Sequence, residues 1–363
     1  MTNQPHSPST VDLDAISYDE ISEPAVMNKN PLVSVLMITF NHRPYIAEAI
    51  EGVLMQKTDF PIELVIGEDC STDGTREIVL EYQKQHPDAI RVITSERNVG
   101  ASPNELRTFK ACRGKYIAFC EGDDYWHHPH KLQKQVDILE EDLDVGLVHT
   151  GVDRYYVKTG RRVPWSATPR KTGGYDTFTN ILLDMHPTIY TCTACMRRSQ
   201  LVSVYQDNPD SFSDEFINTD TQTFLEICRI SKVRLIDESL ATYNVLPESA
   251  WQTDDRHKKI QRLRAAYRMQ LHFVRKYSLP AEVEMRIRRG HNSLLLALAF
   301  SAEDKIVAQE ASQEMRNTPG GLAPKQWLML LGTVHPWFGR LIRMCGSGRQ
   351  LLKSAIFGDS ISG

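Results

Sequence analysis

Apolar and amphipathic segments alternate along residues 33–141. Four short runs are almost entirely apolar or β-branched, as in strands that are buried on both faces. They alternate with segments whose apolar spacing or opening residues predict helices. The predicted strands are Val33–Thr39, Ile62–Ile66, Ile90–Thr94 and Tyr116–Glu121, and the predicted helices span about 44–55, 71–85, 103–112 and 129–141. The alternation predicts an α/β domain with a mostly parallel sheet, right-handed crossovers and flanking helices.

The pattern changes after residue 143. A short helix is predicted over Thr221–Ile230, and Asp220 stands where an N-cap residue is expected. From Asp255 onward the pattern is helical and richer in Lys and Arg, which predicts a C-terminal helical extension. Residues 1–30 are polar and aperiodic, so we expect a disordered or loosely attached arm there. Three further strands are predicted, at Val145–Tyr156, Thr188–Met196 and Val233–Ile236.

Composition narrows the class of protein. The 363 residues carry a net charge of −4, so the overall charge does not indicate a nucleic-acid partner. The N-terminus lacks the apolar segment of a signal peptide, and no run of 18 apolar residues predicts a membrane-spanning helix. Seven cysteines, an odd number, fit free thiols in a reducing compartment. We therefore expect a cytoplasmic protein.

Polar residues collect where the four predicted strands of the first half end. Ligands of parallel α/β sheets bind at the carboxyl ends of strands, so these residues are candidate ligand contacts. The acidic cluster in the segment EGDDYW is costly to bury unless something pairs with it. Mg²⁺ or Mn²⁺ bridging to a phosphorylated ligand is one partner, and a Gly-Asp-Asp turn without a ligand is the alternative. The candidates are Thr39 and Asn41, Glu68 and Asp69, Asn98, and Asp123 and Asp124.

Two common phosphate-binding loops are missing from the sequence. GxxxxGK[ST] does not occur, which argues against a P-loop ATPase. No GxGxxG follows the first predicted strand, where Asn41-His42-Arg43-Pro44 stands instead. A phosphorylated ligand must therefore be held in another way, and a carboxylate-bound metal ion is the one available.

Four segments occur in a specific order along the chain. They are VSVLMITFNHRPYIAEAIEGVLMQ, ELVIGEDCSTDGTREIV, ERNVG and GKYIAFCEGDDYW. Together they resemble the inverting family 2 glycosyltransferases with a GT-A fold, over about residues 32–252. The EGDDYW form is similar to the bacterial branch that builds or decorates surface polysaccharides. The resemblance implies a GT-A domain over residues 31–254, with a donor-binding half (31–142) and an acceptor half (143–254), before a helical region at 255–363.

The resemblance implies donor-binding roles for residues at the strand ends. Thr39 and Asn41 would contact the nucleotide, and Asp69, with Glu68 beside it, would hydrogen-bond the nucleobase. Asn98 lies in the loop that would close over the nucleoside. A carboxylate at the nucleobase suits the N3–H group of uracil or thymine, which favours UDP or dTDP.

The resemblance also implies the metal-binding and catalytic residues. Asp123 would reach the ribose, and Asp124, with Asp123 beside it, would ligate Mg²⁺ or Mn²⁺ on the diphosphate. Asp220 would be the catalytic base. A diphosphate leaves well only when its charge is neutralised, which a bound metal ion can do. A carboxylate that takes the proton of the acceptor hydroxyl contributes about 10²–10⁴-fold, and a single displacement inverts the anomeric carbon.

We therefore expect an enzyme, a metal-dependent glycosyltransferase. Its partners would be a nucleoside-diphosphate sugar donor and a glycan or lipid-linked sugar acceptor. Two other functions stay open: a non-catalytic sugar-nucleotide or glycan-binding protein on the same fold, and a metal-dependent nucleotidyltransferase. The nucleotidyltransferase usually needs a Gly-rich first loop with Lys or Arg, and Asn41-His42-Arg43-Pro44 supplies little of it.

The sequence departs from the family pattern after the last predicted strand. Relatives have a segment like YRxHxGG there, whereas this chain has Asn244 and Leu246 at the expected Arg and His. These differences remove a cation and an imidazole that could contact the diphosphate or the metal. Elsewhere, Cys192 and Cys195 form a lone CxxC within a predicted strand, for which packing is favoured over a redox or metal role.

Residues 322–354 combine aromatic and aliphatic residues with interspersed Lys and Arg. Amphipathic helices of this composition can lie in a membrane interface. A helix that packs back on the catalytic domain is the alternative. A lipid-linked acceptor would favour peripheral contact of this segment with the inner face of the membrane.

Overall fold

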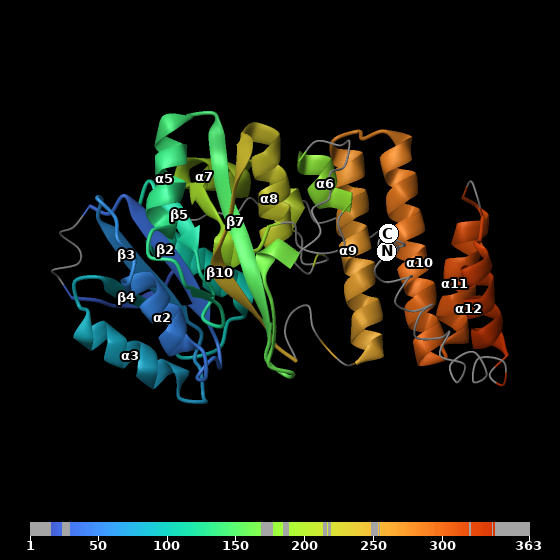
Figure 1. Ribbon diagram of the computed structural model, residues 1–363, viewed down its shortest axis with the longest axis horizontal. Helices are drawn as coiled ribbons and strands as arrows, with labels where there is room; N and C mark the ends of the chain where they lie inside the picture. The colour runs from blue at the N-terminus through green and yellow to red at the C-terminus, as the bar shows by residue number, and fades with distance from the viewer. Residues whose placement is uncertain are drawn as a thin grey trace, which may run out of the picture. The chain divides into compact units, whose positions relative to one another are not determined.

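In the computed structural model the chain forms two compact units, residues 1–213 with 219–246 and residues 214–218 with 247–363. The structure describes residues 16–23, 30–167, 177–183, 189–212, 216, 219–247, 253, 255–318, 321–335 and 337. The first unit contains a mixed sheet with helices packed on it, and helices make up the regular structure of the second (Figure 1). The predicted α/β class with C-terminal helices is confirmed.

The four strands predicted in the first half of the chain pair in parallel. The strand β2 (Val33–Thr39) lies between β3 (Ile62–Glu68) and β5 (Tyr116–Phe119), and β4 (Ile90–Thr94) pairs with β3. Every residue of β4 and of β5 is buried. Burial on both faces explains why these strands are apolar runs rather than alternating patterns.

Four helices follow these strands at nearly the predicted positions. The helix α2 (Ile46–Leu54) buries Ile46, Ala49, Ile50 and Val53, the spacing of one helical face. The others are α3 (Thr75–Gln85), α4 (Ala101–Ala111) and α5 (Lys131–Glu141). The largest shift is at α3, where the predicted start at residue 71 is wrong because residues 71–74 form the turn before the helix.

Part of the N-terminal arm, which the sequence predicts to be disordered or loosely attached, adds a short strand to the sheet. Asp19–Ile21 form the short strand β1, which pairs antiparallel with β4. Glu20 accepts hydrogen bonds from Arg91 at 2.7 Å and 3.0 Å. The Arg91 side chain is only 2% exposed, so this arm supplies part of the negative charge that a buried guanidinium needs. Residues 1–15 and 24–29 lie outside the described residues.

From β5 the sheet of the first unit continues in the order β9-β7-β10-β6. The strand β10 is parallel to β7 and antiparallel to β6, while β9 runs antiparallel to both β5 and β7. The short β8 (Arg161–Val163) pairs with β7. The bounds are β6 (Tyr125–Trp126), β7 (Val145–Tyr156), β9 (Cys195–Arg197), β10 (Lys232–Val245), α6 (Thr177–Leu183), α7 (Arg198–Asp207) and α8 (Thr219–Ile230).

Two of the strands predicted after residue 143 have the wrong length. The strand predicted over Thr188–Met196 is a 3₁₀ turn, η3 (Thr191–Thr193), followed by the short β9. The last strand spans 14 residues, whereas only Val233–Ile236 are predicted. Register shifts between Ile236 and Ala241 break the alternating pattern of this strand. The apolar run in the sequence therefore predicts only its first part, Val233–Ile236.

The second unit contains the helices α9 (Arg256–Lys276), α10 (Ala281–Ala302), α11 (Lys305–Arg316) and α12 (Pro324–Val334). Asp255 caps α9 by accepting from His257 N at 2.8 Å, and Asp304 caps α11 in the same way. No helix among the described residues is long and apolar enough to cross a membrane. Residues 338–354 of the predicted membrane-interface segment lie outside the described residues.

Candidate active site

An acidic turn, residues 121–124, connects β5 to β6 at the carboxyl end of the parallel strands. Gly122 donates its N–H to the carbonyl oxygen of Ile38 at 3.0 Å. A Cβ atom at Gly122 would lie only 2.6 Å from Thr39 Oγ1. The absence of a side chain therefore lets the acidic turn pack directly against the end of β2.

The carboxylates of the acidic turn crowd one another. Burial, and then the charge of Asp123, raise the pKa of Glu121 to about 8. The same two causes raise the pKa of Asp124 well above its usual value. Glu121 Oε2 is buried and has no hydrogen-bond partner among the described residues. The buried ammonium of Lys131 lies within electrostatic reach of Glu121, but one cation does not balance three carboxylates.

This arrangement fits a divalent cation. Ligand atoms of Glu121, Asp124 and Cys192 lie within 4.8 Å of one another, so Glu121 rather than Asp123 groups with Asp124. Carboxylate oxygens suit Mg²⁺ and Mn²⁺, and such an ion would offset the crowded negative charge. Burial raises the pKa of the Cys192 thiol well above its usual value, so this group is a neutral neighbour of the carboxylates. The Asp123 side chain is 20% exposed.

His42 connects the end of β2 with the acidic turn. Its Nδ1 atom lies 3.2 Å from Thr39 Oγ1, and its Nε2 atom lies 3.9 Å from Asp123 Oδ2. Thr39 itself is buried, and His42 lies between its hydroxyl and the Asp123 carboxylate. Sequence reasoning missed His42, because a loop histidine gives no signal until the fold places it beside a carboxylate.

Asn41 holds two loops together. Its backbone has a φ of 55°, a left-handed conformation that Asn tolerates. Its N–H donates to Ser71 Oγ at 3.0 Å, and its Oδ1 accepts from Thr72 N at 2.9 Å. The side chain predicted to contact the nucleotide is thus engaged in fixing the loop after β3.

Glu68, at the end of β3, is fully buried and accepts several hydrogen bonds. Its carboxylate accepts from Ser71 N at 2.6 Å, Cys70 N at 3.3 Å and Thr94 Oγ1 at 3.4 Å. Arg76 Nε lies 3.7 Å from the same group. Glu68 therefore organises the loop that follows it.

Asp69 holds the loop between β4 and α4. Its two carboxylate oxygens accept from Val99 N and Gly100 N, each at 2.9 Å, and Arg107 Nη2 lies 3.3 Å away. Gly100 has a φ of 92°, which favours glycine, and this orients its N–H toward Asp69. Asn98 donates from its side chain to the Asp69 carbonyl at 3.2 Å. The predicted nucleobase and nucleoside contacts thus form one bonded unit.

Asp220 lies in the first turn of α8, which begins at Thr219, so its prediction as the N-cap is wrong. It accepts from Thr191 Oγ1 at 3.0 Å and from Thr221 N at 2.7 Å. Burial outweighs these donors and raises the pKa of Asp220 above its usual value. The Asp220 charge also contributes to the raised pKa of Glu121, which places both carboxylates in one electrostatic environment.

The turn η3 joins the two acidic groups. Thr191 donates to Asp220, while the thiol of the next residue, Cys192, groups with Asp124. The carbonyl of Cys192 accepts from Trp126 Nε1 at 2.7 Å. No sequence signal identifies Thr191, because its partner lies 29 positions away in the chain.

Asn244, which replaces an expected Arg, contacts the acidic turn directly. Its backbone N–H donates to Asp124 Oδ1 at 2.8 Å, and its side-chain Nδ2 donates to the Asp123 carbonyl at 2.6 Å. Leu246 follows the end of β10. The departure from the family pattern therefore falls within the site.

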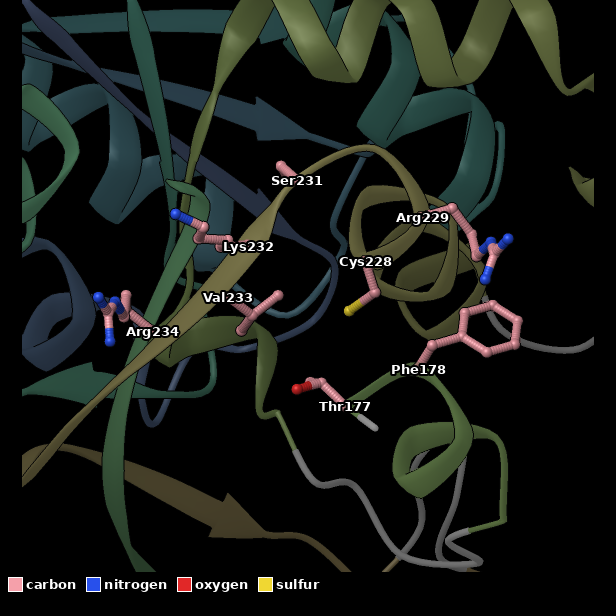
Figure 2. A pocket seen from close by; sticks show the side chains of 8 residues that line it. All are labelled: Thr177, Phe178, Cys228, Arg229, Ser231, Lys232, Val233 and Arg234. Carbon is pink, nitrogen blue, oxygen red and sulfur yellow. The ribbon is translucent and has the colours of Figure 1, made fainter. Parts of the chain in front are cut away.

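A separate hollow of about 390 Å³ lies at the start of β10, twelve residues before Asn244 (Figure 2). Arg229 lies over the Phe178 ring there, with 5.4 Å between the guanidinium carbon and the ring centroid. None of the described residues that line it is acidic, so we do not assign the donor site to it. They are Thr177, Phe178, Cys228, Arg229, Ser231, Lys232, Val233 and Arg234.

Sequence comparison identifies relatives of the first unit. Residues 34–205 match the family model described as Glycosyl transferase family 2. A Bacillus subtilis protein named as the teichuronic acid biosynthesis glycosyltransferase TuaG is 39% identical over 114 residues, 31% of this chain and 44% of TuaG. An uncharacterized Mycobacterium tuberculosis protein is 44% identical over 108 residues, 30% of this chain and 31% of that protein. The chain thus spans less than half the length of these curated relatives.

Two solved structures share the fold. Staphylococcus aureus TarS 1–349 in complex with UDP-GlcNAc superposes with a TM-score of 0.53 at 18% identity, covering 90% of this chain and 92% of that TarS fragment. PcManGT, a mannosyltransferase of Pyrobaculum calidifontis in complex with GDP-Man and Mn²⁺, gives 0.52 at 16% identity, covering 96% and 92%. The predicted GT-A fold with a helical C-terminal part is confirmed.

Proposed function

We propose that the chain is a member of glycosyl transferase family 2, whose family model matches residues 34–205, and that it is a metal-dependent, inverting enzyme. It transfers a sugar from a nucleoside-diphosphate sugar to a hydroxyl of a glycan or lipid-linked acceptor. Residues 31–254 form the catalytic domain in this proposal. TuaG, named for teichuronic acid biosynthesis, supports an acceptor of the surface-polysaccharide class.

The observation that carries the proposal is the meeting of the acidic turn with Asp220. Glu121, Asp123 and Asp124 concentrate negative charge at the sheet edge, and the turn η3 links them to Asp220, because Thr191 donates to Asp220 at 3.0 Å and the next residue, Cys192, groups with Glu121 and Asp124. A metal–diphosphate site needs the first group, and deprotonation of an acceptor hydroxyl needs the second.

Asp124 and Glu121 would hold the divalent cation, and Asp123 would face the ribose. A bound Mg²⁺ or Mn²⁺ neutralises the diphosphate leaving group as a Lewis acid. PcManGT, which has this fold, was solved with Mn²⁺, which supports that choice of metal. His42 Nε2, 3.9 Å from Asp123 Oδ2, helps to orient the Asp123 carboxylate.

Asp220 would take the proton of the acceptor hydroxyl as that oxygen attacks the anomeric carbon. Thr191 and Thr221 N orient its two oxygens. The raised pKa of Asp220 makes it a stronger base than an exposed Asp, closer to the pH at which it works. One attack from the face opposite the diphosphate inverts the configuration.

UDP or dTDP is the proposed nucleotide. A carboxylate offers about four acceptor positions, and Asp69 accepts three hydrogen bonds in the described residues. One position is left for an imino N–H such as that of uracil or thymine. TarS, which has this fold, was solved with UDP-GlcNAc, whereas PcManGT was solved with GDP-Man, so the fold itself does not select the base.

A panel of UDP-, dTDP-, GDP- and CMP-sugars, each with Mn²⁺ or Mg²⁺, tests the function. Nucleotide release would be measured with and without glycan or lipid-linked acceptors. We expect release from a UDP- or dTDP-sugar that depends on both metal and acceptor. Metal-dependent binding without turnover, across the whole panel, would instead support a sugar-nucleotide-binding protein, which the loss of the expected Arg and His at Asn244 and Leu246 favours.

We also propose that the second unit contacts an anionic membrane. On α12 the side chains of Trp327, Leu328 and Leu331 are 42%, 39% and 41% exposed, where a surface helix is normally polar. The guanidinium of Arg316 lies 4.9 Å from the Trp327 ring centroid. Residues 255–363 contain 18 Lys and Arg against 8 Asp and Glu, a net charge of +10 in a chain of −4. Basic charge beside exposed tryptophan suits anionic lipid headgroups.

Co-sedimentation of the full chain with vesicles tests this contact. We expect binding to vesicles containing phosphatidylglycerol at low salt and little binding to phosphatidylcholine alone. Trp327→Ser combined with Leu331→Ser should weaken binding by about tenfold or more, because each side chain contributes about 1.5–3 kcal/mol when buried. Ile306→Ser, at an exposed apolar position on α11, is the control. No binding by the wild type would end the proposal.

A further inference from the structure

Asn244 is the penultimate residue of the strand β10, and it touches two members of the acidic turn at once. Its side chain is 4% exposed. The backbone N–H donates to Asp124 Oδ1 at 2.8 Å, and the side-chain amide donates to the Asp123 carbonyl at 2.6 Å. We infer that Asn244 is a positioning residue that sets the orientation of the metal-binding carboxylates, an inference that rests on the proposed function.

The surrounding strands fix the position of Asn244. Along one edge β10 pairs with β6, which begins directly after the acidic turn, with Thr242 opposite Tyr125. Along the other edge β10 pairs with β7, with Asn244 opposite Tyr155. The distance from Asn244 to the turn is therefore set by two ladders of backbone hydrogen bonds, before any ligand arrives.

Each hydrogen bond has its own consequence for the carboxylates. The amide of Asn244 fixes the plane of the peptide between Asp123 and Asp124, because it binds the carbonyl of that peptide. The backbone N–H donates to Oδ1 of Asp124, and the Cys192 thiol also hydrogen-bonds this carboxylate, so the two donors set the direction in which its remaining lone pairs face. Second-layer hydrogen bonds of this kind orient metal ligands, and their loss typically costs about 10–100-fold in metal affinity.

The chemistry of Asn also matters. A neutral amide donates a hydrogen bond without adding positive charge, so the acidic turn keeps the charge that favours a cation. The side chain is too short to contribute to the diphosphate in the way an Arg could. Asn244 thus acts on the metal site through Asp123 and Asp124 rather than through the substrate.

The test measures Mn²⁺ binding directly, in the presence of UDP, by the EPR signal of free Mn²⁺. Asn244→Ala should weaken Mn²⁺ binding by about 10–100-fold while the melting temperature changes no more than in the control. The control is Asn292→Ala in α10. Asn292 is also 4% exposed and donates its amide to a backbone carbonyl, that of Arg288 at 2.9 Å, but it lies in the other compact unit.

Asn244→Leu provides a second variant of similar size, for use if Asn244→Ala does not fold. It removes the side-chain donor to the Asp123 carbonyl without adding charge, so it should weaken Mn²⁺ binding about as much. If the wild type binds Mn²⁺ and both variants bind it within twofold, the positioning role is wrong and the proposed function stands. If the wild type binds no Mn²⁺ with any nucleotide, the metal site of the proposed function fails, and the positioning role fails with it.

Discussion

Two acidic strand ends flank β2, and they differ in what their carboxylates touch. At the end of β3, Glu68 and Asp69 accept hydrogen bonds from backbone N–H groups and lie close to Arg76 and Arg107. In the acidic turn after β5, Glu121 has a buried oxygen without a partner among the described residues. Burial, and then the like charges around them, raise the pKa of both Glu121 and Asp124.

The difference separates the structural use of Glu68 from the metal-binding use expected of the acidic turn, while Asp69, with one acceptor position left, holds a loop and can still bind a nucleobase. A buried carboxylate whose oxygens are satisfied by the protein stabilises the loops that donate to it. A buried carboxylate beside others, with an oxygen left over, is costly unless a cation arrives. Residues of one chemical type, at neighbouring strand ends, therefore have different expected roles, and mutation can test the distinction.

The largest effect is expected at the acidic turn. Asp124→Asn should weaken Mn²⁺-dependent UDP binding by more than about 100-fold and bring transfer below detection, because the residue would ligate the ion directly. Isothermal titration with and without Mn²⁺ measures this. Glu140→Gln, which removes one exposed charge elsewhere in the same unit, is the control. Unchanged Mn²⁺ affinity in Asp124→Asn would remove the basis of the comparison.

A smaller effect, confined to the chemical step, is expected at Asp220. Asp220→Asn should lower transfer by about 10²–10⁴-fold and leave Mn²⁺ and nucleotide binding within twofold of the wild type. Burial raises the pKa of Asp220, so this carboxylate takes up a proton at a higher pH than an ordinary Asp, whose pKa is about 3.9. As the pH is lowered, kcat/KM should therefore already fall at a pH above about 3.9.

Thr191→Val sharpens the assignment of Asp220 as the base. It removes a donor that stabilises the charged carboxylate, so it should move the acid limb of the pH profile to higher pH. Normal transfer by Asp220→Asn, or an acid limb that Thr191→Val leaves in place, would show that another group takes the proton.

The smallest effect on function is expected at Glu68. Glu68→Gln should lower the free energy of unfolding by about 1–3 kcal/mol, since it weakens bonds to buried donors, and it should leave Mn²⁺ affinity unchanged. Urea denaturation measures the first quantity and Mn²⁺ titration the second. Glu81→Gln, an exposed position on α3, is the control. Weaker Mn²⁺ binding at unchanged stability would place Glu68 in the metal site after all.

The apolar strands are predictable from sequence because burial on both faces requires an uninterrupted run of apolar residues. The predicted bounds Ile90–Thr94 and Val145–Tyr156 are those of β4 and β7. The short β1 is not predictable, because three residues carry no pattern and its register follows from pairing with β4. For β10, the register shifts after Ile236 hide its continuation.

For the candidate active site, the sequence predicts where the site lies better than it predicts the role of each residue. Strand ends of one parallel sheet share an edge, so the gathering of polar groups there follows from topology. The contacts that divide the roles join distant segments: Asn244 and Asp124 are 120 positions apart, and Glu68 and Thr94 are 26 apart. Such pairings depend on the packed fold and leave no local pattern.

The loop held by Asp69 has a consequence for donor binding. A nucleobase that binds Asp69 meets a carboxylate already shared by Val99 N and Gly100 N. Stronger engagement by the ligand weakens the hold on that loop, so donor arrival and loop movement become a single linked equilibrium. Donor binding would then be coupled to the position of this loop, whereas the acidic turn is held between the strands β5 and β6.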